Sequence, residues 1–191
     1  MDIKVDHVSK AYGEQQVLRD LSCVFPEGKT TCIRGRSGSG KTTLIQLLLR
    51  LDVPDKGKIE GISDRKLSAV FQEDRLCENL SAASNIRLVC TKTISDRELE
   101  EAYKAVALTE VWQKPVRELS GGMRRRVSIL RALLAESDGV IMDEPLRGLD
   151  EKTRAKTIDY ILKKTERKTL IFVTHEEKEA VWLKADRTVG I

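Results

Sequence analysis

The hydrophobic positions of the chain fall into short apolar runs separated by longer amphipathic segments. Runs of this length are typical of strands, whereas apolar residues at every third or fourth position are typical of helices. Because the later runs alternate with helical segments, the pattern predicts a mainly parallel sheet with both faces covered. The first two runs, separated by Tyr12 and Gly13, predict an antiparallel β region at the N-terminus. The predicted strands cover residues 3–8, 17–25, 30–33, 69–71, 139–142 and 169–173.

The middle of the chain has the pattern of helices. Ser95 and Glu98 have the spacing of a capping box, and Ser120 is suited to cap a further helix over residues 121–136. No convincing strand interrupts this stretch. We therefore expect one α/β domain over residues 1–191, with a catalytic core and N-terminal β region at 1–75 and 137–191 and an α-helical subdomain at 76–136.

Composition narrows the classes of protein. With 191 residues, of which 40% are hydrophobic and 34% charged, the chain suits one compact domain and not a disordered segment. The net charge is only +4 and the eight aromatic residues are scattered, so no nucleic-acid partner is expected. No apolar run approaches the roughly 20 residues of a membrane span, and no signal-peptide pattern is visible at the N-terminus. We expect a soluble, intracellular chain.

Several residues with reactive or charged side chains are predicted to have structural roles and not functional ones. Arg124, Arg125 and Arg126 point in directions about 100° apart on a helix, so we expect a solvated or subunit-facing surface and not a nucleic-acid stripe. His7 is likewise interpreted as structural. The cysteines have no zinc-site spacing and are predicted to be reduced and packed as small apolar side chains. They are Cys23, Cys32, Cys77 and Cys90.

Residues 35–42 match the phosphate-loop pattern G-x-x-x-x-G-K-[ST] completely. Its glycines let backbone N–H groups turn toward phosphates, and the following helix adds the positive end of its dipole. Lys41 can reach the β- and γ-phosphates, and the Thr42 hydroxyl can ligate Mg²⁺. A strand precedes the loop and a helix follows it, as this pattern requires. The predicted nucleoside triphosphate site comprises Gly35, Arg36, Ser37, Gly38, Ser39, Gly40, Lys41, Thr42 and Thr43.

A second acidic motif follows the apolar run at 139–142. Asp143 and Glu144 lie where the strand ends, at the carboxyl edge of the sheet, which is where open α/β folds bind ligands. Asp143 is suited to bind Mg²⁺ through a water molecule, and Glu144 can orient or deprotonate a water molecule beside the γ-phosphate.

Between these two motifs, the sequence Leu-Ser-Gly-Gly-Met at 119–123 resembles the signature of ATP-binding cassette (ABC) ATPases. Further motifs of that family occur in order over nearly the whole chain. They are the adenine-stacking aromatic (Tyr12), the Q-loop glutamine (Gln72), the Walker B segment (143–145), the D-loop (148–150) and the switch histidine (His175).

The resemblance implies roles for these residues. Ser120, Gly121 and Gly122 contact the γ-phosphate of ATP that is held by another copy of the cassette. Gln72 touches Mg²⁺ and the attacking water and begins the segment that senses a membrane partner. His175 contacts the γ-phosphate, and Asp150 belongs to the D-loop. The residues expected to be catalytic are Glu144, His175, Gln72 and Lys41, and those expected to support Mg²⁺ are Thr42, Gln72 and Asp143.

The chain departs from the family pattern at a few places. Met123 replaces a common glutamine, as in importer cassettes of the nitrate, sulfonate and thiamine type. Arg147 and Gly148 stand where the D-loop commonly has serine and alanine, a departure that bears on communication between the two sites. The segment 57–67 is short, which predicts that a strand or hairpin is lost there. No regulatory C-terminal domain is expected after Ile191.

The sequence therefore predicts the ATP-hydrolysing subunit of an ABC transporter, with import favoured over export. Two copies are expected to dimerise head to tail around two MgATP and to drive a separate permease at the inner face of the cell membrane. An extracytoplasmic substrate-binding protein is a further expected partner. The alternatives are a soluble ABC-type ATPase of DNA repair or translation, and a nucleotide-binding interaction module without turnover.

Overall fold

The computed structural model describes residues 1–109 and 111–191, which form two sheets and a group of helices. The smaller sheet is antiparallel, with strand order β2-β1-β4, and confirms the predicted N-terminal β region. Its strands are β1 (Ile3–Tyr12), β2 (Gln15–Phe25) and β4 (Lys56–Glu60). The predicted loss of a strand near residues 57–67 is wrong, because β4 pairs with β1 through Val5 and Ile59.

The larger sheet is five-stranded, and every neighbouring pair in it is parallel. Its order is β5 (Leu67–Val70), β6 (Gly139–Asp143), β7 (Thr169–Val173), β3 (Thr30–Arg34) and β8 (Arg187–Gly190). The prediction of a mainly parallel sheet is confirmed. Strand β8 was not predicted, because its residues are mostly exposed and polar and lack an apolar run.

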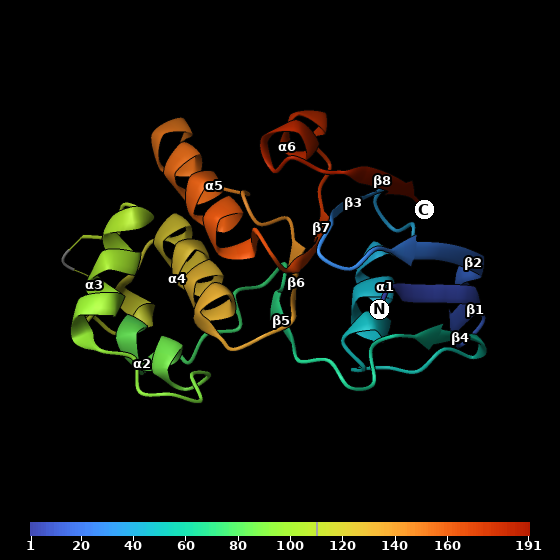
Figure 1. Ribbon diagram of the computed structural model, residues 1–191, viewed down its shortest axis with the longest axis horizontal. Coiled ribbons are helices and arrows are strands. Elements are labelled where there is room, and N and C mark those ends of the chain that lie inside the picture. The colour runs from blue at the N-terminus through green and yellow to red at the C-terminus, as the bar shows by residue number, and fades with distance from the viewer. Residues whose placement is uncertain (110) are drawn as a thin grey trace.

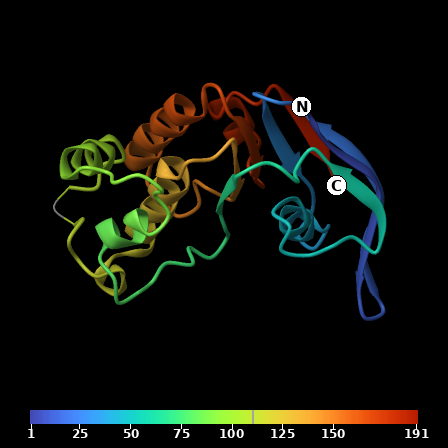
Figure 2. The same ribbon diagram turned by 60° about the horizontal axis from the view of Figure 1, so that its bottom comes forward.

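Helices α2, α3, α4 and α5 gather at the end of the molecule opposite the antiparallel sheet, whereas α1 lies between the two sheets and α6 lies nearer β7 and β8 (Figure 1 and Figure 2). Both predicted caps are present: Ser95 and Glu98 form a capping box, and Ser120 accepts a hydrogen bond from the backbone of Met123. No helix among the described residues is long and apolar enough to cross a membrane. The helices are α1 (Lys41–Leu48), α2 (Ala82–Arg87), α3 (Asp96–Ala105), the 3₁₀ turn η1 (Val116–Glu118), α4 (Gly121–Leu134), α5 (Glu151–Thr165) and α6 (Glu177–Trp182).

The central strands separate two hydrophobic clusters. Successive side chains of a strand point to opposite faces of the sheet. Accordingly, Val140 and Met142 of β6 pack with the cluster on the side of the helical group, whereas Ile141 packs with the cluster around α1 and the antiparallel sheet. Burial on both faces explains why β6 and β7 read as continuous apolar runs in the sequence.

The cysteines only partly follow the prediction. All four are free; Cys32 is buried, and Cys23 and Cys90 are half-buried. Burial raises the pKa of the Cys23 and Cys32 thiols to about 11, which keeps them as neutral, apolar groups. Cys77 is exposed, so the prediction of a packed side chain is wrong there.

Asn85 in α2 organises the segment between β5 and the helical group. Its side chain accepts a hydrogen bond from the Cys77 amide (2.8 Å) and donates to the carbonyls of Cys77, Leu80 and Ser81 (3.0, 3.4 and 3.1 Å). The Asn85 side chain is fully buried, so it makes these four hydrogen bonds out of contact with water.

We expect Asn85→Ala to lower the free energy of unfolding by about 2–4 kcal/mol, because four hydrogen bonds of a buried side chain are lost together. Urea unfolding followed by circular dichroism measures the change. The exposed Asn79→Ala variant, which loses one hydrogen bond with Arg117, is the control and should change stability by less than about 0.5 kcal/mol. Equal stability of the two variants would contradict the role of Asn85.

Candidate nucleotide site

The phosphate loop lies between the end of β3 and the start of α1, and glycine is required in it. Gly38 and Gly40 have φ of 78° and 95°, in the left-handed region that favours glycine. A side chain on Gly40 would place its Cβ 2.6 Å from Leu18 Cδ2 and 3.0 Å from the Val17 carbonyl oxygen. The backbone of the loop is therefore free to approach a ligand closely.

Lys41, the first residue of α1, lies with its ammonium across this loop. The side chain is 6% exposed, and its Nζ donates to the carbonyl oxygens of Gly35 (2.9 Å) and Arg36 (2.7 Å). Both acceptors are neutral, and an ammonium group has three N–H donors. The geometry therefore keeps a positive charge available for an anionic oxygen at the loop.

Thr42 and Asp143 meet beside Lys41, although 101 positions separate them in the sequence. The Thr42 hydroxyl donates to Asp143 Oδ2 at 3.3 Å, and Asp143 is 4% exposed at the end of β6. Burial raises the pKa of the Asp143 carboxyl, and the hydrogen bond from Thr42 opposes this. A hydroxyl and a carboxylate beside a phosphate loop fit Mg²⁺, which prefers oxygen ligands and commonly combines one carboxylate with phosphate oxygens and water.

Glu144 and His175 are brought together because β6 and β7 are adjacent and parallel, so that Asp143 pairs with Val173. Glu144 Oε1 lies 3.0 Å from His175 Nε2, and its Oε2 lies 3.4 Å from Arg147 Nη1. The backbone of Glu144 has φ of 48° and donates its N–H to the Val173 carbonyl at 3.0 Å. A left-handed residue is uncommon outside glycine, and this one sits where the strand turns toward the loop.

These groups line one hollow of about 280 Å³, which we call the phosphate hollow. The exposed Gln72, after β5, also reaches it. Two β2 residues in its wall, Gln15 and Val17, were not predicted; neither belongs to a motif. The lining residues are Gln15, Val17, Ser37, Gly38, Gly40, Lys41, Thr42, Thr43, Gln72, Asp143, Glu144 and His175.

The other predicted site residues lie outside the lining of the phosphate hollow. Tyr12 is 46% exposed, and its hydroxyl donates to Asp52 Oδ2 at 2.7 Å. Gly35 and Arg36 accept the hydrogen bonds of Lys41, and Ser39 is half-buried within the loop. The remaining ones, Ser120, Gly121, Gly122 and Asp150, lie at the starts of α4 and α5.

The starts of α4 and α5 are close to each other. A Cβ on Gly122 would lie 3.2 Å from the Gly148 carbonyl oxygen, so the signature segment packs against the segment that follows Glu144. Asp150 caps α5 by accepting a hydrogen bond from the Thr153 amide at 3.0 Å. The hydrogen bonds from the Thr153 hydroxyl and amide lower the pKa of Asp150.

The predicted surface position of the arginine run is wrong for two of its three members. Arg125 is 4% exposed and Arg126 is 7% exposed, whereas Arg124 is half-buried. Most acceptors of the two buried guanidinium groups are backbone carbonyls of other segments, and the spacing of residues along one helix carries no signal for such acceptors. His7 is an exposed residue whose ring pairs with Asp20 at 2.8 Å.

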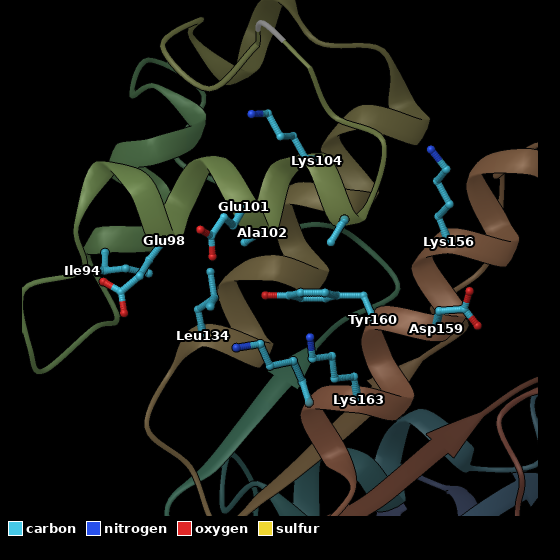
Figure 3. A pocket seen from close by; sticks show the side chains of 12 residues that line it. Ile94, Glu98, Glu101, Ala102, Lys104, Leu134, Lys156, Asp159, Tyr160 and Lys163 are labelled. Atoms are coloured by element: carbon cyan, nitrogen blue, oxygen red, sulfur yellow. The ribbon is translucent and has the colours of Figure 1, made fainter.

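A larger hollow of about 600 Å³ lies between α3 and α5, away from the phosphate loop (Figure 3). The ring of Tyr160 projects from α5 toward Ala102 and Leu134 (Figure 3). Acidic and basic side chains both line this hollow, so the charge of its lining does not define an anion site. The charged residues are Glu98, Glu101, Asp159, Lys104, Lys156, Lys163 and Lys164.

Comparison with known proteins agrees with this geometry. The family model described as ABC transporter matches residues 18–147. The sulfate/thiosulfate import ATP-binding protein of Synechococcus elongatus is 33% identical over 94% of this chain and 57% of its own length. The aliphatic sulfonates import ATP-binding protein of Zymomonas mobilis is 34% identical over 100% of this chain and 82% of its own length. The chain thus spans little more than half of the sulfate/thiosulfate relative.

Solved structures are similar over the whole chain. A dimeric ATP-binding cassette in a post-hydrolysis state, bound to ADP and Pi, superposes with a TM-score of 0.87 at 28% identity, covering 99% of this chain and 94% of that one. A bacterial Atm1-family exporter with ATP bound, at 24% identity and a TM-score of 0.88, shares the fold. The family match, the import relatives and the arrangement of the phosphate hollow agree: the chain belongs to the ABC transporter family.

Proposed function

We propose that this chain is the ATP-hydrolysing subunit of an ABC transporter and that the transporter is an importer. The observation that carries the proposal is the phosphate hollow, where Lys41, Thr42, Asp143, Glu144 and His175 converge from three separate motifs. The import ATP-binding relatives support the direction of transport.

The proposed chemistry is phosphoryl transfer to water, which depends on positioning and on neutralising charge. Lys41 binds the β- and γ-phosphate oxygens of ATP. Thr42, Gln72 and, through water, Asp143 would hold Mg²⁺, which would supply further positive charge. Glu144 takes a proton from the attacking water as the water oxygen bonds to the γ-phosphorus, and the bond to the β–γ bridging oxygen breaks to release ADP. The contact of Glu144 with His175 at 3.0 Å orients both side chains toward the γ-phosphate. Tyr12 is proposed to stack on the adenine ring.

Each proposed site needs a second copy of the chain. Ser120, Gly121 and Gly122 begin α4 with N–H groups free to bind an anion, yet they lie outside the lining of the phosphate hollow of their own subunit. We propose that they contact the γ-phosphate held by the partner copy, with Asp150 in the adjoining D-loop. The dimeric ADP- and Pi-bound cassette among the similar structures supports this arrangement.

The proposed permease partner fits a groove of about 380 Å³ beside the Q-loop, which we call the apolar groove. Its apolar lining includes Leu51, Phe71, Val89, Ala132 and Ala135, and the charged residues Lys66, Arg131 and Glu136 also border it. Leu51 is 59% exposed and Val89 is 39% exposed, which leaves apolar surface for a partner. The helical subdomain, residues 76–136, would move with this partner at the inner face of the membrane, and an importer would also use a substrate-binding protein outside.

We expect the double variant Leu51→Asp, Val89→Asp to lose its membrane partner, because the charges oppose burial of the groove. The measurement is affinity capture from detergent-solubilised membranes, followed by identification of captured integral membrane proteins. Val181→Asp, which alters a 77% exposed valine outside the groove, is the control and should capture the permease normally. Recovery of only ribosomal or DNA-repair components by the unaltered chain would overturn the transporter function.

A further inference from the structure

A single buried guanidinium connects the Q-loop to the end of β6. Arg125 Nη1 donates to the Phe71 carbonyl at 2.5 Å and contacts Asp74 Oδ1 at 3.1 Å. Its Nη2 donates to the carbonyls of Asp143 at 3.0 Å and Glu144 at 2.8 Å. Because a guanidinium is a rigid planar fork, movement of one set of acceptors displaces the other or breaks hydrogen bonds.

The acceptors of Arg125 adjoin the groups that the proposed hydrolysis uses. Phe71 directly precedes Gln72, and the carbonyl of Glu144 belongs to the residue proposed as general base. Glu144 has a left-handed backbone, so its side-chain direction depends on the groups that fix this turn. Arg125 and the Glu144 amide, which donates to Val173, hold the turn from both sides of the residue.

We propose that Arg125 is a positioning residue, which orients Glu144 for hydrolysis and couples that orientation to the position of Gln72. This inference rests on the proposed function and adds a residue from the signature helix of the same subunit. A partner that moves the Q-loop at Gln72 thereby changes the setting of Glu144 through one side chain.

The neighbouring Arg126 provides a matched control. It is buried to a similar extent, and it also donates to three backbone carbonyls: Gly122 at 3.0 Å, Val106 at 3.0 Å and Ala107 at 2.8 Å. One acceptor, Gly122, belongs to the signature at the start of α4, and the other two follow α3, so none lies in the Q-loop or at the end of β6. Loss of either arginine therefore removes a comparable set of buried hydrogen bonds, but only Arg125 touches the segments of Gln72 and Glu144.

The Q-loop keeps another anchor when Arg125 is changed. Arg131 donates to the carbonyls of Asp74 at 3.0 Å and Arg75 at 2.8 Å, so the segment after Gln72 remains attached to α4. We therefore expect Arg125→Gln to fold, with the segments at Phe71 and at Glu144 held less tightly because the guanidinium that joins them is lost.

The test compares Arg125→Gln, Arg125→Lys and Arg126→Gln in the full chain by steady-state ATP hydrolysis and by hydrogen exchange. Arg125→Gln is expected to lower kcat roughly 10- to 100-fold with KM for ATP changed less than about twofold, because misplacing a catalytic group affects turnover more than binding. Arg125→Lys keeps the positive charge but not the planar guanidinium, so its kcat is expected to lie between those of Arg125→Gln and the unaltered chain. Arg126→Gln is expected to reduce thermal stability; because Arg126 also donates to Gly122 of the signature, its hydrogen-exchange pattern, and not its kcat, serves as the control.

Hydrogen exchange tests the connection without relying on hydrolysis. In Arg125→Gln, peptides over residues 71–75 and 143–147 should both exchange faster, whereas Arg126→Gln should affect peptides over residues 105–108. Two outcomes would overturn the role of Arg125: faster exchange in only one of the two segments, or a kcat of Arg125→Gln equal to that of the unaltered chain. Absence of hydrolysis by the unaltered chain would instead overturn the proposed function, and the exchange pattern would still decide whether Arg125 connects the two segments.

Discussion

Glu144→Gln is expected to leave ATP binding intact and to lower steady-state hydrolysis by about 10²- to 10⁴-fold, the usual contribution of a general base. The amide has nearly the size of the carboxylate but cannot take a proton from water. Lys41, Thr42 and Asp143, which hold phosphate and Mg²⁺ in the proposed site, are unchanged. Phosphate release measures turnover, and equilibrium binding of ATP measures the site; gel filtration with MgATP should show a more persistent dimer.

The control for Glu144→Gln is the loss of another carboxylate near His175. Glu177 is 80% exposed in its side chain and pairs with Arg34 at 2.9 Å, so Glu177→Gln makes the same change of charge near the site without touching the phosphate hollow. It should retain hydrolysis within about twofold, as expected for a screened surface pair. Normal turnover by Glu144→Gln would contradict the assignment of Glu144 as general base.

The convergence of the phosphate hollow could be predicted from the sequence because it follows from strand topology. The loop after β3 and the residues after β6 and β7 all lie at the carboxyl ends of neighbouring parallel strands. Apolar runs predicted β6 and β7, and the glycine and lysine spacing of the phosphate loop located the end of β3. Local hydrogen bonding was equally predictable where partners are close in sequence, as for Ser95 with Glu98.

Contacts between distant segments could not be predicted in the same way. Arg125 is separated by 54 positions from Phe71 and by 19 from Glu144, and three consecutive arginines resemble a solvated surface. Their burial depends on carbonyls that only the folded chain presents. Strand β8 was missed for a related reason: an edge strand pairs along one side, so exposed polar residues such as Arg187 and Thr188 interrupt the apolar pattern.

Two inactive variants are expected to restore hydrolysis when mixed, if the site is shared between copies. Lys41→Ala removes the ammonium group that is proposed to bind phosphate. Gly121→Asp adds a negative charge at the signature; an added Cβ there meets no atom within 4 Å, so the subunit should fold normally. Each variant alone is expected to lose at least about 10²-fold in kcat, as when one group that stabilises transition-state charge is removed.

A mixed dimer contains one site with both defects and one site with neither, because Lys41 and Gly121 of the same copy serve different sites. With random pairing at equal amounts, roughly a quarter of the sites should be intact, so the mixture should regain roughly a quarter of the original ATP hydrolysis. A mixture of Lys41→Ala with Glu144→Gln is the control: both residues line the phosphate hollow of one copy, so every site in the mixed dimer stays defective. If hydrolysis does not recover in the first mixture, the signature does not act on the partner's ATP. If hydrolysis recovers in the control, Lys41 and Glu144 of one copy do not serve the same site, which also contradicts the proposed arrangement. Recovery only in the first mixture requires a head-to-tail dimer.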